Sequence, residues 1–199
     1  MAIKENGSKR KKKHILNQMK TEFYAVSENE RLSRAMICAM AAQLDITVDD
    51  LADVRCAVSE AVTNVVVHAY KGDTQAKDDR QRTVYILTTL YDDRSIKIII
   101  RDRGCGIGDI PQAMEPLYTT DMSGERSGMG FAIMQNFMDA VRVKSAPGRG
   151  TTVEMRKKFA PPVHPLAEEK TEDEGTIEVP GAQQNVQNEP SGHGQEGIA

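Results

Sequence analysis

The chain has 199 residues, a formal net charge of −3 and 39% hydrophobic residues, which suits one folded domain with tails. No stretch approaches the roughly 18 apolar residues of a membrane-spanning helix, and the start lacks the apolar segment of a signal peptide. Three cysteines at unrelated spacings exclude a disulfide framework and a zinc site. The sequence therefore predicts a cytoplasmic protein with reduced thiols and no membrane contact.

Charge is unevenly distributed between the two ends of the chain. Residues 1–18 carry six basic side chains against Glu5, a sum of +5, whereas residues 160–199 carry eight acidic side chains against Lys170, a sum of −7. We predict a disordered basic extension at 1–18, a folded domain at 19–159 and a disordered acidic tail at 160–199. The folded domain is then near −1, which disfavours direct DNA binding. Met19 is an alternative start of the chain.

Two capping signals predict two helices after a strand at 22–26. Ser27 and Glu30 form a capping-box pattern that opens a helix to about residue 44. Its apolar stripe comprises Leu32, Ala35, Met36, Ala39 and Met40. Thr47 and Asp50 repeat the signal and open a longer helix to about residue 70.

Alternating hydrophobicity predicts a hairpin after a loop at 71–82. The alternating residues are Val84, Ile86, Thr88 and Leu90, then Ile96, Ile98 and Ile100. Residues 103–127 lack periodicity and are expected to form a lid. A helix from 128 to about 139 and strands at about 140–146 and 150–157 follow. The expected fold is a two-layer α/β sandwich, with a mixed sheet and helices on one face.

Asp102 continues the parity of the preceding strand, so its carboxylate is expected on the core side. Burial there costs several kcal/mol unless the carboxylate is hydrogen-bonded. Gly104, Gly106 and Gly108 follow and permit close approach of a ligand to the backbone. Such an acid can bind the amino edge of a flat base; the alternative is a hydrogen-bonded Asp that starts an ordinary glycine turn.

Glu60 and Asn64 are four residues apart on the predicted long helix and therefore share a face. A carboxylate and an amide oxygen beside a cleft suit a general base and a magnesium ligand. The alternative is a polar pair on a solvated helix face.

A second glycine-rich segment, Ser127-Gly128-Met129-Gly130-Phe131, opens the next helix. Bare amide groups at a helix start suit phosphate oxygens, and Arg126 just before them is placed to reach a terminal phosphate. The alternative is a plain glycine turn. After the hairpin glycines, Thr151 begins a strand where its hydroxyl could bind a base edge near Asp102.

The order of these four motifs is similar to that of the GHKL ATPase superfamily. More narrowly, Ser59-Glu60-Ala61-Val62-Thr63-Asn64, Pro116-Leu117-Tyr118-Thr119-Thr120 and Glu125-Arg126-Ser127-Gly128-Met129-Gly130-Phe131 resemble the anti-sigma-F factors of endospore-forming bacteria. The resemblance covers about residues 19–159.

The resemblance implies an ATP-dependent serine protein kinase that binds sigma-F and phosphorylates an anti-anti-sigma factor. It implies Glu60 as catalytic base and Asn64 as ligand of Mg²⁺. It also implies nucleotide contacts from Asp102, Gly104, Gly106, Arg126, Gly128, Gly130 and Thr151. Arg34 would contact protein partners, and the protein would be a homodimer.

Two other functions are compatible with parts of the sequence. A histidine kinase needs a phosphoacceptor histidine on a dimerisation helix, but His14 lies in the basic extension. A non-catalytic sigma-binding module would keep a nucleotide only for structural reasons, but such a site needs no general base at Glu60. Transfer of the γ-phosphate to an antagonist separates these possibilities.

Overall fold

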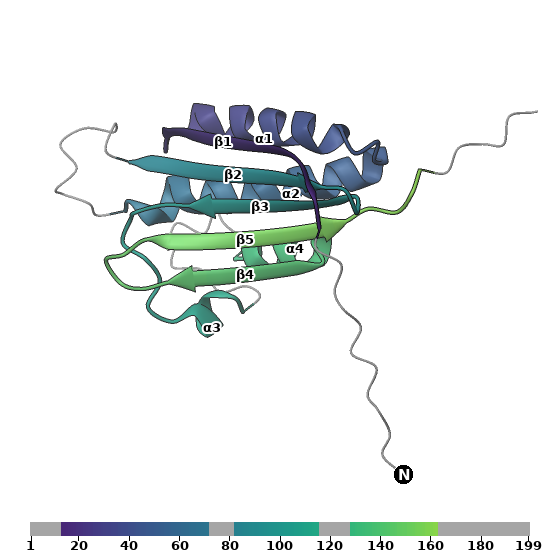
Figure 1. Ribbon diagram of the computed structural model, residues 1–199. Coiled ribbons are helices and arrows are strands. Elements are labelled where there is room, and N and C mark those ends of the chain that lie inside the picture. The colour runs from purple at the N-terminus through teal and green to yellow at the C-terminus, as the bar shows by residue number, and fades with distance from the viewer. Residues whose placement is uncertain (1–12, 72–81, 116–127, 163–199) are drawn as a thin grey trace, which may run out of the picture. The chain divides into compact units, whose positions relative to one another are not determined.

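The computed structural model describes residues 13–71, 82–115 and 128–162. These residues form one sheet with helices on one face, which confirms the predicted two-layer sandwich (Figure 1). In chain order the elements are β1 (Ile15–Tyr24), α1 (Ser27–Ala42), α2 (Val48–Asn64), η1 (Val65–Ala69), β2 (Thr83–Tyr91), β3 (Ser95–Arg101), α3 (Ile110–Ala113), α4 (Gly130–Phe137), β4 (Ala140–Ser145) and β5 (Thr151–Lys158). Most of the predicted loop at 71–82, part of the predicted lid and nearly all of the acidic tail lie outside the described residues.

The sheet has five strands in the order β1-β2-β3-β5-β4, and all four pairings are antiparallel. The expected mixed sheet is therefore wrong. β3 and β4 do run in the same direction, but β5 lies between them and pairs antiparallel with both.

The central hairpin follows the predicted alternation. Leu90 pairs with Ile96 and Ile86 with Ile100, and these side chains are buried beneath the helices. Asp102 keeps the same parity and is 3% exposed. The Asp102 carboxylate at the end of β3 therefore lies on the same side of the sheet as the buried isoleucines.

β1 begins earlier than predicted. It starts at Ile15, which pairs with Tyr91, so residues 15–18 belong to the sheet and not to a disordered extension. Its first four residues, Ile15-Leu16-Asn17-Gln18, do not alternate between apolar and polar and are all exposed, so the period-two pattern did not reveal the strand. A chain that begins at Met19 would lack this part of the ladder.

α1 is rotated relative to the prediction. Its N-terminus at Val26 has no side-chain cap, so the Ser27 capping box is wrong; Glu30 instead accepts a hydrogen bond of 3.0 Å from the Thr63 hydroxyl of α2. Leu32 of the predicted stripe is 48% exposed, and the buried residues are Ser33, Ile37, Met40 and Ala41. Apolar residues surround much of this helix, so contacts with α2 and the sheet set its rotation.

α2 begins as predicted, because the Thr47 hydroxyl accepts a hydrogen bond from the Asp50 amide at 3.1 Å. Its buried residues are Val54, Ala57, Val58, Ala61 and Val62. The helix continues as the π-helical turn η1 directly after Asn64, and such turns are frequent at functional sites.

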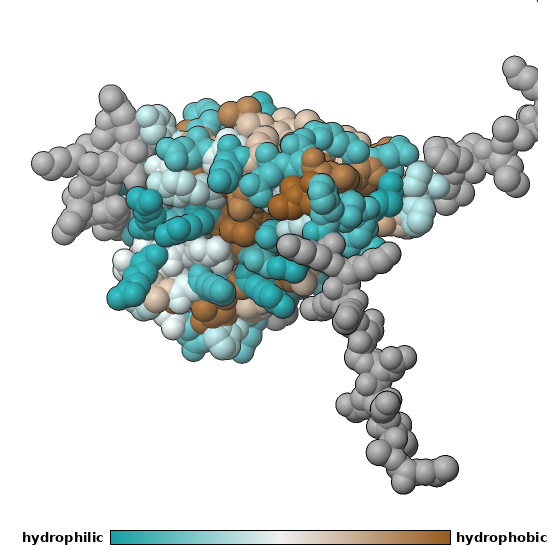
Figure 2. Space-filling model, in the orientation of Figure 1, coloured by the Kyte–Doolittle hydropathy of each residue, from teal (hydrophilic) through white to brown (hydrophobic). Residues whose placement is uncertain are grey.

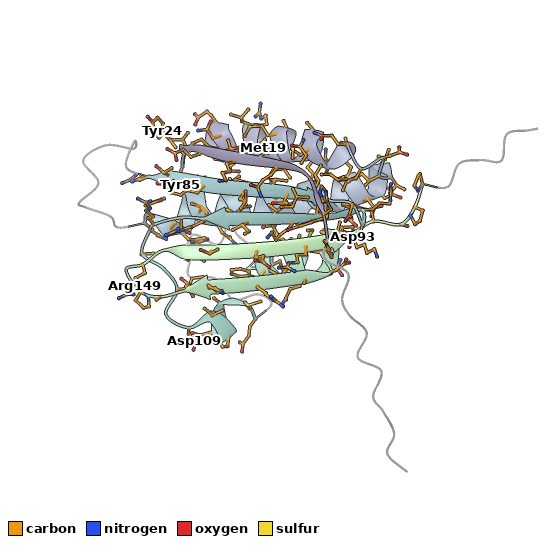
Figure 3. The ribbon with its side chains drawn as sticks, viewed as in Figure 1. Met19, Tyr24, Tyr85, Asp93, Asp109 and Arg149 are labelled. Carbon is orange, nitrogen blue, oxygen red and sulfur yellow. The ribbon has the colours of Figure 1, made fainter. Side chains whose placement is uncertain are left out.

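The opposite face of the sheet is mostly hydrophilic, with smaller apolar areas between the polar side chains (Figure 2). Asp93 marks the end of the sheet at the β2–β3 turn, and Arg149 marks the opposite end at the β4–β5 turn (Figure 3). β3 ends beside Arg149, so the motifs that follow β3 gather at that end.

Candidate functional site

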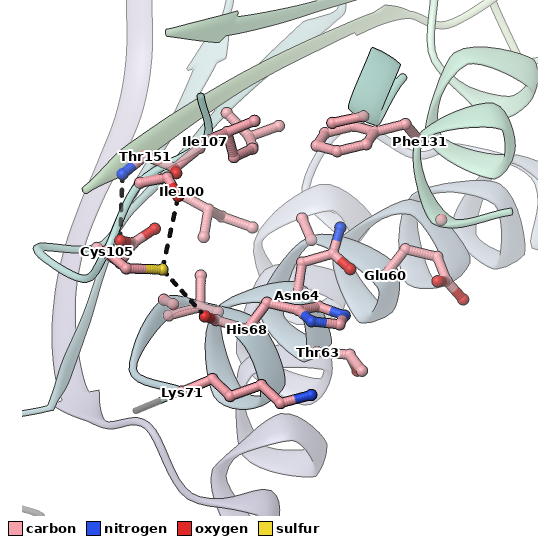
Figure 4. A pocket seen from close by; sticks show the side chains of 18 of the residues that line it. Glu60, Thr63, Asn64, His68, Lys71, Ile100, Cys105, Ile107, Phe131 and Thr151 are labelled. Carbon is pink, nitrogen blue, oxygen red and sulfur yellow. Dashed lines mark hydrogen bonds between the residues drawn. The ribbon is translucent and has the colours of Figure 1, made fainter. Parts of the chain in front are cut away.

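A cavity of about 660 Å³ lies among α2, the start of α4, the C-terminal end of β3 and the start of β5 (Figure 4). That volume is within the range of small-molecule sites. Its lining includes Glu60, Asn64, Asp102, Gly106, Gly128, Gly130 and Thr151. The structure therefore brings most of the sequence-predicted site residues to one cavity. Arg126 lies outside the described residues.

Backbone donors fix the carboxylate of Asp102. Its Oδ1 atom accepts hydrogen bonds from the amides of Gly104 at 2.8 Å and Thr151 at 3.1 Å. Burial raises the pKa of Asp102 above its ordinary value, and these two hydrogen bonds oppose the rise. Because both bonds end on Oδ1, Oδ2 is the oxygen placed to accept a hydrogen bond from a ligand.

Ser145 is a site residue that the sequence reasoning missed. Its hydroxyl shares a hydrogen bond of 2.9 Å with the Thr151 hydroxyl and accepts one of 2.8 Å from the Ile107 amide. Ser145 ends β4 directly opposite Thr151, so strand pairing would have identified it. The bonds orient Thr151 and hold the Gly106–Ile107 backbone at the cavity wall.

Gly104 and Gly106, the first two glycines after β3, both lie against the backbone of neighbouring segments. Gly104 is not among the described lining residues; a Cβ there would lie 1.8 Å from the Ala69 carbonyl oxygen. Gly106 has φ +72°, and its Cβ would lie 2.1 Å from the Ala146 carbonyl oxygen. The chain thus passes between the end of η1 and the β4–β5 turn, where only glycine fits.

Gly104→Ala is expected to destabilise the fold at or above the upper end of the roughly 1–3 kcal/mol typical of overpacking, because its Cβ meets backbone atoms of Ala69. Gly108→Ala is the matched control, since a Cβ at Gly108 meets nothing within 4 Å. Urea denaturation of both variants tests this. Equal urea midpoints of unfolding for the two variants would show that the Ala69 backbone can shift to make room for the Cβ with little loss of stability.

Glu60 and Asn64 lie against the first turn of α4. A Cβ on Gly130 would be 3.1 Å from Glu60 Oε2 and 3.5 Å from Asn64 Oδ1. Gly128, just before the helix, has φ +64°. The acid and the amide therefore face a helix start whose first amides have no intrahelical partner.

Apolar side chains complete the cavity, and the sequence reasoning did not assign them. Ile100 and Val153 come from the core face of β3 and β5, and Ile107 and Phe131 flank them. Figure 4 shows Ile100, Ile107 and Thr151 grouped together, with Glu60 and Asn64 on the helix across the cavity. One part of the cavity is apolar with a fixed acid, and the other carries the polar Glu60–Asn64 pair beside the start of α4.

Cys105 and Arg34 differ in their position relative to the cavity. Cys105 lines the cavity with its Sγ 3.4 Å from the His68 carbonyl oxygen. Arg34 of α1 is not among the lining residues and donates to the Ser59 hydroxyl at 3.0 Å.

In the described part of the chain, no cluster of three or more His, Cys, Asp or Glu side chains could hold a metal. None of the helices described is long and apolar enough to cross a membrane.

Comparison with known proteins identifies relatives of this chain. The family model for the histidine kinase-like ATPase domain matches residues 23–157. An anti-sigma F factor of Oceanobacillus iheyensis is 48% identical over 144 residues, which are 72% of this chain and 94% of that protein. The anti-sigma F factor of Bacillus subtilis is 45% identical over 141 residues, covering 71% and 92% of the two chains.

A solved structure shows the same fold at lower identity. The RsbU and RsbW domains of a Mycobacterium tuberculosis protein superpose with a TM-score of 0.52 at 20% identity, covering 73% of this chain and 33% of that chain. The chain belongs to the anti-sigma F factor family, and its residues 23–157 match the histidine kinase-like ATPase domain.

Proposed function

We propose that this protein binds ATP in the cavity, holds sigma-F in an inactive complex and transfers the γ-phosphate to a serine of an anti-anti-sigma factor. The observation that carries the proposal is the convergence on one cavity of Asp102, the Glu60–Asn64 pair and the start of α4. The names of the relatives support the sigma partner.

The adenine ring lies at the apolar end. Asp102 accepts a hydrogen bond from the adenine amino group, and Thr151, oriented by Ser145, is the second contact with the base. The first turn of α4 and the backbone at Gly128 and Gly130 bind the outer phosphates through bare amides.

Glu60 is the general base. It accepts the proton of the serine hydroxyl as the bond from serine oxygen to the γ-phosphorus forms and the bond to the β-phosphate oxygen breaks, releasing ADP. Asn64, one helical turn away, would hold Mg²⁺ together with phosphate oxygens, and the ion would neutralise phosphate charge. The amide oxygen suits this hard cation, and a Cβ at Gly130 would fill the space beside it.

Arg34 is the proposed partner contact. It lies on α1, and its guanidinium donates to Ser59, the residue before Glu60. A partner held by Arg34 would therefore lie near the part of α2 that carries the proposed base. We also propose that the protein is a homodimer and that it binds neither DNA nor membrane.

Incubation of the purified chain with γ-³²P-ATP, Mg²⁺ and an anti-anti-sigma factor tests the proposal. Label is expected on one serine of that factor and is absent when this serine is replaced by alanine. Binding of ATP and of sigma-F without any transfer would instead establish a non-catalytic sigma-binding module.

A further inference from the structure

Lys157 ties three elements together away from the cavity. Its ammonium donates to Asp53 Oδ2 at 2.7 Å and to the Phe137 carbonyl oxygen at 3.1 Å. It is also 3.5 Å from Asp50 Oδ1. Its side chain is only 13% exposed. The cation of β5 thus joins the first turns of α2 to the last residue of α4.

These contacts lie at one end of a helix pair whose other end borders the cavity. Gly130 begins α4 against Glu60 of α2, and Phe137 ends α4 at Lys157 beside Asp53 of the same helix. Gly130 and Phe137 are seven positions apart in the chain, as are Glu60 and Asp53, which is a distance of roughly 10 Å along either helix. α4 therefore lies antiparallel along α2, held at Phe137 and facing Glu60 at its start.

The charge of Lys157 suits this position. Burial by itself would lower the pKa of Lys157, but Asp53 and Asp50 outweigh that effect and raise the pKa above its ordinary value. The ammonium therefore stays charged at neutral pH. A cation at a helix C-terminus satisfies an orphan carbonyl and interacts favourably with the helix dipole.

We propose that Lys157 is a positioning residue for phosphate binding: its bonds to Asp53 and Phe137 fix α4 along α2 and so hold the amides at the start of α4 beside Glu60 and Asn64. This proposal rests on the proposed ATP site and adds a determinant outside it. It implies that the loss of Lys157 affects binding of a nucleotide's phosphates and not of its base. Asp102, directly after β3, and Thr151, at the start of β5, bind the base, whereas Lys157 lies near the other end of β5.

Affinities for ATP and adenosine, measured by titration, test this selectivity. In Lys157→Met the ratio of ATP affinity to adenosine affinity is expected to fall about tenfold or more, with adenosine binding unchanged. Lys157→Arg, which keeps the charge and the donors, should restore most of the ratio, and Asp53→Asn should lower it. Lys158→Met is the matched control, because this neighbouring lysine is exposed. Equal losses for ATP and adenosine, or no change in the ratio, would overturn the proposal.

Hydrogen exchange without nucleotide distinguishes failure of this proposal from failure of the proposed function. Two amides should exchange at least tenfold faster in Lys157→Met: that of Ile133 in α4, which donates to the Met129 carbonyl, and that of Met138 directly after α4, which donates to the Met134 carbonyl. Amides of α1 should be unchanged. Exchange in α4 at the wild-type rate contradicts the proposal. If the wild-type chain binds no ATP, the proposed function is wrong, and so is the role of Lys157 in phosphate binding. The exchange rates of the α4 amides would still show whether Lys157 fixes the helix.

Discussion

Glu60→Gln is expected to lower phosphoryl transfer by roughly 10²–10⁴-fold, the contribution typical of a general base, while ATP affinity stays within about twofold. Gln keeps the size of the side chain beside Gly130, where a Cβ would be 3.1 Å from Glu60 Oε2, but it cannot accept the serine proton. Single-turnover transfer and ATP titration measure the two effects separately.

The control for this variant is Glu22→Gln on the exposed side of β1, which should leave both quantities unchanged. Transfer by Glu60→Gln at the wild-type rate would mean that another group, or none, removes the proton. A parallel loss of ATP affinity would instead show that the carboxylate acts in binding.

Asp102→Asn is expected to weaken ATP binding by roughly 10–100-fold, the value of a hydrogen bond to a charged group. Two backbone amides bond to Oδ1, so the Asn carbonyl must take that place. The Asn amino group then replaces Oδ2 and meets the adenine amino group, and both are donors.

Without nucleotide, the Asp102→Asn substitution should not lower the folding stability of the protein. Because burial raises the pKa of Asp102 in the folded state, ionisation costs folding free energy at any pH above the unfolded-state pKa. The neutral Asn removes this cost, so the variant should be as stable as the wild type or more stable. A fall in melting temperature that accompanies the fall in affinity would assign Asp102 to the fold and not to the ligand.

The raised pKa also predicts a pH dependence of binding. Wild-type affinity for ATP should fall as the pH drops through the pKa of Asp102, at a higher pH than for an exposed Asp, and Asp102→Asn should lack this component. Asp49→Asn on the exposed start of α2 is the control. Identical pH profiles for the wild type and Asp102→Asn would contradict the role of the carboxylate.

The sequence predicted those features that depend on period and spacing. Alternation along β3 placed Asp102 on the core side, the spacing of four placed Glu60 and Asn64 on one helix face, and the Thr47 cap is present. Each of these depends on residues close together in the chain, where helix and strand geometry fix directions.

The remaining features depend on contacts between distant segments. β1 begins at Ile15 because it pairs with β2, although its first side chains are exposed. α1 takes its rotation from contacts with α2, and Ser145 enters the site through its pairing with Thr151. Lys157 was missed for the same reason, since its partner Asp53 is distant in sequence. Hydrophobic pattern carries no information on such partners.

A crystal structure with Mg²⁺ and a non-hydrolysable ATP analogue would show directly whether the cavity is the nucleotide site. We expect the adenine amino group on the Asp102 carboxylate and the outer phosphates on the first turn of α4, beside Glu60 and Asn64. An analogue bound elsewhere, or bound here with its base away from Asp102, would contradict this expectation.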